Sequence, residues 1–195
     1  MIESIVERTA LKEWSVLCDA MRRGEIVTLV RKGGIREQRA GFSVRHERFL
    51  LYPTFFHERA DELAPRFRGA VDAAPRPADG TVRLELVAEV AAVWRVTDLE
   101  RLRAIEGEHG LAWRAVESRF RYRDRPEVRV VAARVATLRA AVELPELRRY
   151  RGCVSWVELD RDVDVSGAAP ALPPLDFTRR LARLRRALGE PELEG

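Results

Sequence analysis

The pattern of hydrophobic and polar residues predicts five β-strands, at residues 25–31, 42–52, 81–90, 127–138 and 152–159, and the apolar run that contains the third strand continues to Val96. In residues 42–52 both faces of the strand change from polar to apolar midway. This change is typical of a strand that runs from an open rim into a core. His46 would lie at the rim, and Pro53 is expected to end the strand.

Helical spacing of apolar residues predicts a first helix over residues 9–21, capped by Thr9. Shorter helices are expected at residues 58–67, 97–106 and 113–120, the second of them from a capping box that begins at Thr97. A last helix is expected after Asp176, with an apolar stripe formed by Phe177, Leu181, Leu184 and Leu188.

These elements predict an α+β fold. We expect a single domain over residues 1–160 and a proline-containing linker over residues 161–176. The amphipathic helix at residues 177–190 would then pack on the domain.

The charge of the chain permits an anionic partner such as nucleic acid. The 35 basic and 31 acidic residues give a net charge of +4, and all but two of the basic residues, Lys12 and Lys32, are arginines. Basic side chains displace counterions from phosphates. Most of the charges nevertheless have opposite charges near them in sequence, as expected for mixed, solvated faces.

The two cysteines indicate a reducing compartment. Cys18 and Cys153 are far apart, lie in apolar surroundings and form no CxxC pair, which favours two buried thiols over a disulfide or a zinc site. We expect a cytoplasmic location and no membrane partner, because there is no apolar signal core near the start of the chain and no run of 18 apolar residues.

The segment RHERFLLYPTFFHERAD, residues 45–61, concentrates titratable side chains: His46, Glu47, Tyr52 and His57. Histidine exchanges protons near neutral pH, so His46, Glu47 and His57 are the candidates for acid/base catalysis in a hydrolytic enzyme. A metal site is not expected, since the HExxH spacing is missing. The alternative is a rim histidine and a helix-start histidine with ordinary hydrogen bonds.

Two basic segments are candidates for phosphate contacts. Arg31-Lys32-Gly33-Gly34 places two cations beside glycines, which let backbone amides approach an anion, although a simple hairpin turn explains it as well. Residues 113–129 interleave arginines with aromatic rings, and such rings stack on bases. The alternative is a helix end whose arginines pair with nearby acids. The candidates in this second segment are Arg119, Arg121, Tyr122 and Arg123.

Four ordered blocks carry a family resemblance: ALKEWSVLCDAM, LVRKGGIRE, VRHERFLLYPTFFHE and YRGCVSWVEL. Together they resemble the bacterial family of domains of unknown function 1802, over most of the chain up to about residue 160. Some members of that family occur beside a restriction-endonuclease-like domain. The resemblance therefore implies a link to DNA restriction or defence and a nuclease partner protein.

The order of predicted elements also resembles the PUA-like barrels of the ASCH and EVE group. That resemblance implies a small, mostly antiparallel barrel or curled sheet with flanking helices, and a cleft that holds RNA or a modified base. No cofactor is expected. Three functions are compatible with the sequence: a nucleic-acid-binding module, a hydrolytic enzyme acting on a nucleotide or nucleic acid, and a structural partner subunit. The sequence does not define the oligomeric state. In a nucleic-acid-binding module, the phosphates would contact Arg31, Lys32 and the arginines of residues 114–125. The base or other ligand would contact His46, Glu47, Tyr52, His57 and Trp156.

Overall fold

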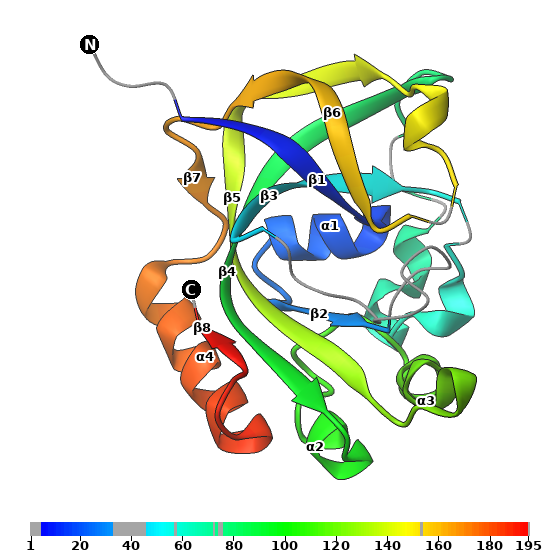
Figure 1. Cartoon of the computed structure of the whole chain (residues 1–195), viewed down its shortest axis with the longest axis vertical. Coiled ribbons are helices and arrows are strands. Elements are labelled where there is room, and N and C mark those ends of the chain that lie inside the picture. The colour runs from blue at the N-terminus through cyan, green and yellow to red at the C-terminus, as the bar shows by residue number, and fades with distance from the viewer. Residues whose placement is uncertain are drawn as a thin grey trace.

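A strongly curled β-sheet forms the centre of the computed structural model, which describes residues 5–32, 46–56, 58–71, 73, 76–152 and 154–194 (Figure 1). The strands follow the order β2-β5-β4-β3-β1-β6, with β7 paired to β5 and β8 to β4. All pairs are antiparallel except β1 with β3. The strands are β1 (Val6–Trp14), β2 (Thr28–Arg31), β3 (Arg48–Thr54), β4 (Thr81–Val96), β5 (Val128–Pro145), β6 (Trp156–Asp164), β7 (Ala169–Pro170) and β8 (Leu193–Glu194).

The curl comes from the long β4–β5 pair. Its register shifts twice, between Leu84 and Leu86 and between Val90 and Ala92. Such irregularities bend a strand and increase its twist. The bent sheet wraps around helix α1 (Ser15–Arg22), whose apolar face packs in the larger of two hydrophobic cores (Figure 1).

Three further helices flank the sheet: α2 (Leu99–Ala104), α3 (Trp113–Arg121) and α4 (Pro174–Leu188). The described residues also contain four 3-10 helices, at Ala60–Glu62, Pro65–Ala70, Tyr122–Asp124 and Arg148–Tyr150. The expected α+β class, with a mostly antiparallel curled sheet and flanking helices, is confirmed. No helix of the described chain has the length and apolar character needed to cross a membrane.

The helix predicted over residues 9–21 is wrong in its first half. Residues Val6–Trp14 form strand β1, which lies between β3 and β6, and only Ser15–Arg22 is helical. Leu11, Trp14 and Cys18 have helical spacing, but two neighbouring strands satisfy the backbone of β1, and this pairing overrides the local pattern. Thr9 is consequently a buried strand residue and caps no helix.

The other boundaries differ more modestly. Strand β3 continues through Pro53 to Thr54 beside β1, and the helix expected over residues 58–67 consists of two 3-10 turns, the second beginning at Pro65. Asp98, and not Thr97, caps α2 by accepting the amide of Glu100. In the segment expected as a linker, β6 continues to Asp164 and β7 pairs with β5.

Helix α4 is attached by an apolar stripe and by a cluster of ion pairs. Phe177, Leu181, Leu184 and Leu188, the predicted stripe, are all buried. On the same helix, Arg180 and Arg183 donate to the two carboxylate oxygens of Glu108, at 2.7 and 2.5 Å. Arg180 also donates to the carbonyls of Gly24 and Glu25, so it joins α4 to two loops.

Replacing Glu108 should therefore destabilise the domain strongly. The side chains of Arg180 and Glu108 are only 15% and 12% exposed. Glu108→Ala leaves a buried cation without its partner, and we expect a loss of about 3–5 kcal/mol in the free energy of unfolding, measured by urea denaturation. The control is Asp176→Ala, which removes the partner of the exposed Arg179 on the same helix. It should cost below about 1 kcal/mol, and equal losses would contradict this account.

Candidate functional site

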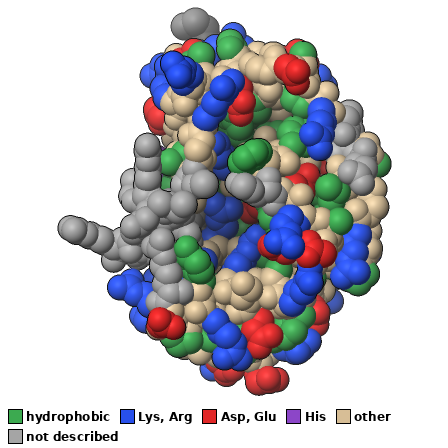
Figure 2. All heavy atoms as spheres, turned by 90° about the vertical axis from the view of Figure 1, so that its right-hand side faces the viewer, with side chains coloured by type: hydrophobic (Ala, Val, Ile, Leu, Met, Phe, Trp, Pro, Cys, Tyr) green, Lys and Arg blue, Asp and Glu red, His purple; other side chains and the backbone are tan. Residues whose placement is uncertain are grey.

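A cleft of about 950 Å³ opens between the two ends of the strand order. The ends of β1, β2 and β3 and the start of β4 form part of its walls. The rest comes from residues 76–80, helix α3, and the residues Arg151, Gly152, Val154 and Ser155. Figure 2 shows this face of the molecule: Lys and Arg side chains lie inside the hollow, and hydrophobic side chains stand around it. The cleft thus lies at the seam, the gap between β2 at one end of the order and β1 with β6 at the other.

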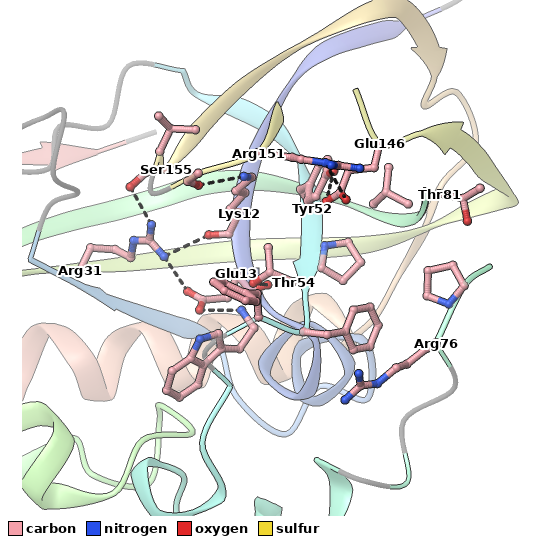
Figure 3. A pocket seen from close by; sticks show the side chains of 18 of the residues that line it. Lys12, Glu13, Arg31, Tyr52, Thr54, Arg76, Thr81, Glu146, Arg151 and Ser155 are labelled. Atoms are coloured by element: carbon pink, nitrogen blue, oxygen red, sulfur yellow. Dashed lines mark hydrogen bonds and ion pairs between the residues drawn. The ribbon is translucent and has the colours of Figure 1, made fainter. Parts of the chain in front are cut away.

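Arg31 bridges the seam with its guanidinium group (Figure 3). From the end of β2, its Nη1 donates to Glu13 Oε2 and to the carbonyl of Lys12, both at 3.1 Å, and its Nη2 donates to Ser155 Oγ at 2.9 Å. The side chains of Arg31 and Glu13 are 15% and 4% exposed. Side-chain contacts, and not backbone hydrogen bonds, therefore connect the described part of β2 with β1 and with Ser155.

Lys12 fixes the loop that precedes β6. Its ammonium donates to the carbonyls of Tyr150 and Gly152 and lies 5.6 Å from the centre of the Tyr52 ring. Its backbone amide donates to the Ser155 carbonyl at 2.8 Å. These contacts hold Gly152 and Ser155 against β1, where they form part of one wall of the cleft.

Tyr52 and Glu146 place a hydrogen-bonding pair beside Lys12 and Arg151 (Figure 3). The Tyr52 hydroxyl donates to Glu146 Oε1 at 3.4 Å, and Glu146 Oε2 pairs with Arg151 Nε at 3.6 Å. Burial, followed by the charge of Glu146, raises the pKa of the Tyr52 phenol well above its ordinary value. The phenol stays protonated at neutral pH and acts as a hydrogen-bond donor.

Lys32 fixes the end of helix α3 beside β2. Its ammonium donates to the backbone carbonyls of Phe120, Arg125 and Glu127, which uses all three of its N–H donors. Burial lowers the pKa of the Lys32 ammonium, and the nearby charge of Glu127 opposes that effect. Lys32 thereby has a structural part in the cleft.

The lining of the cleft is predominantly cationic and aromatic. Six basic side chains face three acidic ones, so the excess charge is positive. The basic residues are Lys12, Arg31, Lys32, Arg76, Arg119 and Arg151; the acidic ones are Glu13, Asp79 and Glu146; the aromatic ones are Trp14, Tyr52, Phe55, Phe56 and Tyr122.

Residues 10–183 match the model of a family described as a domain of unknown function, DUF1802. The chain belongs to the DUF1802 family. A comparison with curated proteins gave no match.

Solved structures similar to this DUF1802 domain include the ASCH protein from Zymomonas mobilis. That structure is 15% identical, with 90% of this chain and 94% of that chain covered and a TM-score of 0.49. Two mutant forms of the same protein are similar at 12% and 14% identity, with TM-scores of 0.47 and 0.42. They cover 90% and 92% of this chain and 96% and 99% of theirs.

The cleft contains five of the residues predicted from the sequence as ligand or phosphate contacts. Four other predicted residues do not line it, and three lie outside the described residues, as does the side chain of Arg123. Lining the cleft are Arg31, Lys32, Tyr52, Arg119 and Tyr122; elsewhere on the domain are His46, Glu47, Arg121 and Trp156; outside the description are Gly33, Gly34 and His57.

His46 does not share the cleft with Tyr52 because it precedes the start of β3, whereas Tyr52 lies near the other end of that strand. Six residues of extended chain span about 20 Å. The His46 ring instead meets the edge of Trp156 at 5.3 Å, and Trp156 in turn meets Phe49 at 5.1 Å, so this tryptophan packs on the core. Glu47 is exposed, and its backbone carbonyl accepts the amide of Val90.

Sequence reasoning missed several cleft residues, for identifiable reasons. Lys12 and Glu13 were assigned to a helix, so their direction in a strand could not be foreseen. Arg76 lies in a segment without a periodic pattern, and Glu146 and Arg151 follow the long strand β5. Within the described ranges, no three His, Cys, Asp or Glu side chains are grouped as a metal would require.

His109 lies behind the cleft wall, near Arg119, and gives a pH-dependent prediction. The residue is 1% exposed; its Nδ1 accepts the amide of Leu111, and its Nε2 has no partner in the described structure. Burial, and then the positive charges of Arg119 and Arg66, lower its pKa from 6.5 to about 4. The folded domain therefore holds the neutral imidazole, whereas the unfolded chain takes up a proton at about pH 6.5.

Stability should consequently fall as the pH drops from 6.5 to about 4, by about 3 kcal/mol in total from this group. His109→Asn keeps a hydrogen-bond acceptor but does not titrate, and it is the control. The free energy of unfolding of the original protein minus that of the variant, from urea denaturation between pH 4 and 7, isolates the histidine. Parallel pH profiles for the two proteins would refute the assignment.

Proposed function

We propose that this DUF1802 domain binds nucleic acid, with unpaired nucleotides entering the cleft. The observation that carries the proposal is the convergence of six basic and five aromatic side chains on one cavity. Arginine pairs with phosphates, and aromatic faces stack on bases of any sequence. A cavity of about 950 Å³ has the size of a small-ligand site, so a segment of single strand fits and a duplex does not.

Arg76 and Arg151 are the strongest candidates for contacts with the phosphates of the strand. Arg76 lies over the ring of Phe55 at 5.4 Å and forms no ion pair with a described residue. Arg151 is 59% exposed and holds only a loose pair with Glu146. Both guanidinium groups can therefore turn toward a ligand, unlike the ammonium groups of Lys12 and Lys32, which donate to backbone carbonyls.

Bases would be held by stacking and read by hydrogen bonds. Phe55 and Tyr122 supply aromatic rings in the cleft wall. The Tyr52 hydroxyl and the Glu146 carboxylate supply a donor and an acceptor at one place, which is the combination needed to read the edge of a base. Recognition of a modified base would use this pair. A part in DNA restriction beside a nuclease partner rests on the family resemblance.

The catalytic alternative, hydrolysis through His46, Glu47 and His57, receives no support from the cleft. His46 and Glu47 do not line it, and the Tyr52 phenol is held protonated and so does not serve as a base. We therefore propose binding without covalent chemistry.

Binding should weaken with salt in proportion to the phosphates contacted. The probe is a fluorescein-labelled single strand of about 12 nucleotides, as DNA and as RNA. We expect the double variant Arg76→Gln, Arg151→Gln to bind more weakly and to reduce the slope of log affinity against log salt by about 1.4, since each contact with a single strand contributes about 0.7. Fluorescence anisotropy at several salt concentrations measures the slope.

The matched control is the double variant Arg179→Gln, Arg186→Gln. It removes the same charge from exposed positions of α4, away from the cleft, and should leave the slope unchanged. A slope near zero for the original protein, or an equal reduction by both variants, would count against binding in the cleft.

A further inference from the structure

Arg119 has a largely buried guanidinium without a carboxylate partner. Its Nη1 donates to the Val30 carbonyl at 2.9 Å, and the group lies 5.3 Å from the centre of the Trp14 ring. On the same helix, Arg114 and Arg121 form ion pairs with Asp61 and Glu117, whereas Arg119 forms none with any described residue. A buried cation normally has a partner, because removing a charge from water is costly.

The nearest carboxylate cannot supply that partner. Glu13 accepts the amide of Trp14 through Oε1 and pairs with Arg31 through Oε2, so both of its oxygens are engaged. Burial is the main cause that lowers the pKa of the Arg119 guanidinium; the charge of Glu13 opposes this effect, and the charge of Arg31 adds to it. Two guanidinium groups therefore share one carboxylate at this end of the cleft.

The free donors of Arg119 form a fork. Nε and Nη2 have no hydrogen-bond partner among the described residues, and neither is sealed from solvent, while Arg119 itself lines the cleft. These two nitrogens lie on one edge of the planar group, which is the edge that binds two oxygens of a phosphate or carboxylate at once.

We propose that Arg119, beside the Arg31–Glu13 pair, forms an anion subsite at the inner end of the cleft that takes the terminal phosphate of a nucleic-acid strand or mononucleotide. This inference rests on the proposed function and specifies its ligand. A terminal phosphate ends the chain and carries a charge of about −1.5 to −2 at pH 7, which offsets the unpaired guanidinium better than a single charge.

The test compares oligonucleotides of one sequence that end in a 5′-phosphate, a 3′-phosphate or hydroxyl groups only. Adenosine monophosphate and adenosine form a second pair without a strand. We expect the unmodified protein to bind one phosphate-ended strand about tenfold or more tightly than the hydroxyl-ended strand at the same salt concentration. The preference should grow from pH 5 to pH 7.5, as the phosphate loses its second proton near pH 6.

Two variants assign the preference to the subsite. Arg119→Gln should abolish it, whereas Arg121→Gln, which removes the same charge from a 66% exposed position of the same helix, should retain it. Arg119→Lys keeps the charge but not the fork, and we expect it to keep only part of the preference. The comparison of ligands on the unmodified protein does not depend on the folding of any variant.

The outcomes separate this inference from the proposed function. Salt-dependent binding of all strands with equal affinity overturns the terminal-phosphate subsite and leaves the nucleic-acid proposal standing. Binding of adenosine monophosphate but of no strand supports the subsite and overturns the proposal of strand binding. Equal loss of the preference in the Arg119→Gln and Arg121→Gln variants overturns the subsite, because the effect would then be one of total charge.

Discussion

The curl of the β4–β5 pair is the constraint on which the rest of the structure depends. Two register shifts bend these long strands, and the bend brings β2 from one end of the strand order toward β1 and β6 at the other. Because the backbone ladder does not close, the Arg31 guanidinium joins the ends through Glu13 and Ser155. The cleft is the space that this incomplete closure leaves, and its lining is drawn from every strand end that reaches the seam.

Most of the sheet could be predicted from the sequence, because period-two alternation reports which face of a strand is buried. Strand β4 begins at the expected Thr81 and continues beyond Val90 to Val96, and helix α3 follows its expected bounds within a residue. Strand β1 could not be recognised, since Leu11, Trp14 and Cys18 also fit a helix and only the pairing with β3 and β6 decides between the two. Because a helix was expected over these residues, Lys12 and Glu13 were not predicted as cleft residues; their side chains reach the cleft from strand β1.

The candidate site was predicted in part, and the part that failed illustrates a limit of local reasoning. Histidines and acids close together in sequence suggested one site, but an extended strand separates neighbours quickly, and His46 precedes the start of β3, whereas Tyr52 lies near its other end. The arginines of α3 also divide by direction: Arg119 points into the cleft and Arg121 toward Glu117 in solvent. A helix turns by about 100° per residue, so two arginines two positions apart face opposite sides.

The two buried guanidinium groups at the seam show how stability and binding are divided between similar side chains. Arg31 has a buried carboxylate, a hydroxyl and a carbonyl as acceptors, so its charge is compensated within the fold. Its role is to connect β2 with β1 and with Ser155. Arg119 has one carbonyl and no carboxylate, an arrangement that costs stability in the isolated domain. Folds carry such uncompensated groups where a ligand completes them, because binding then supplies the missing partner. This asymmetry between the two arginines is the basis on which we propose that the cleft binds an anion.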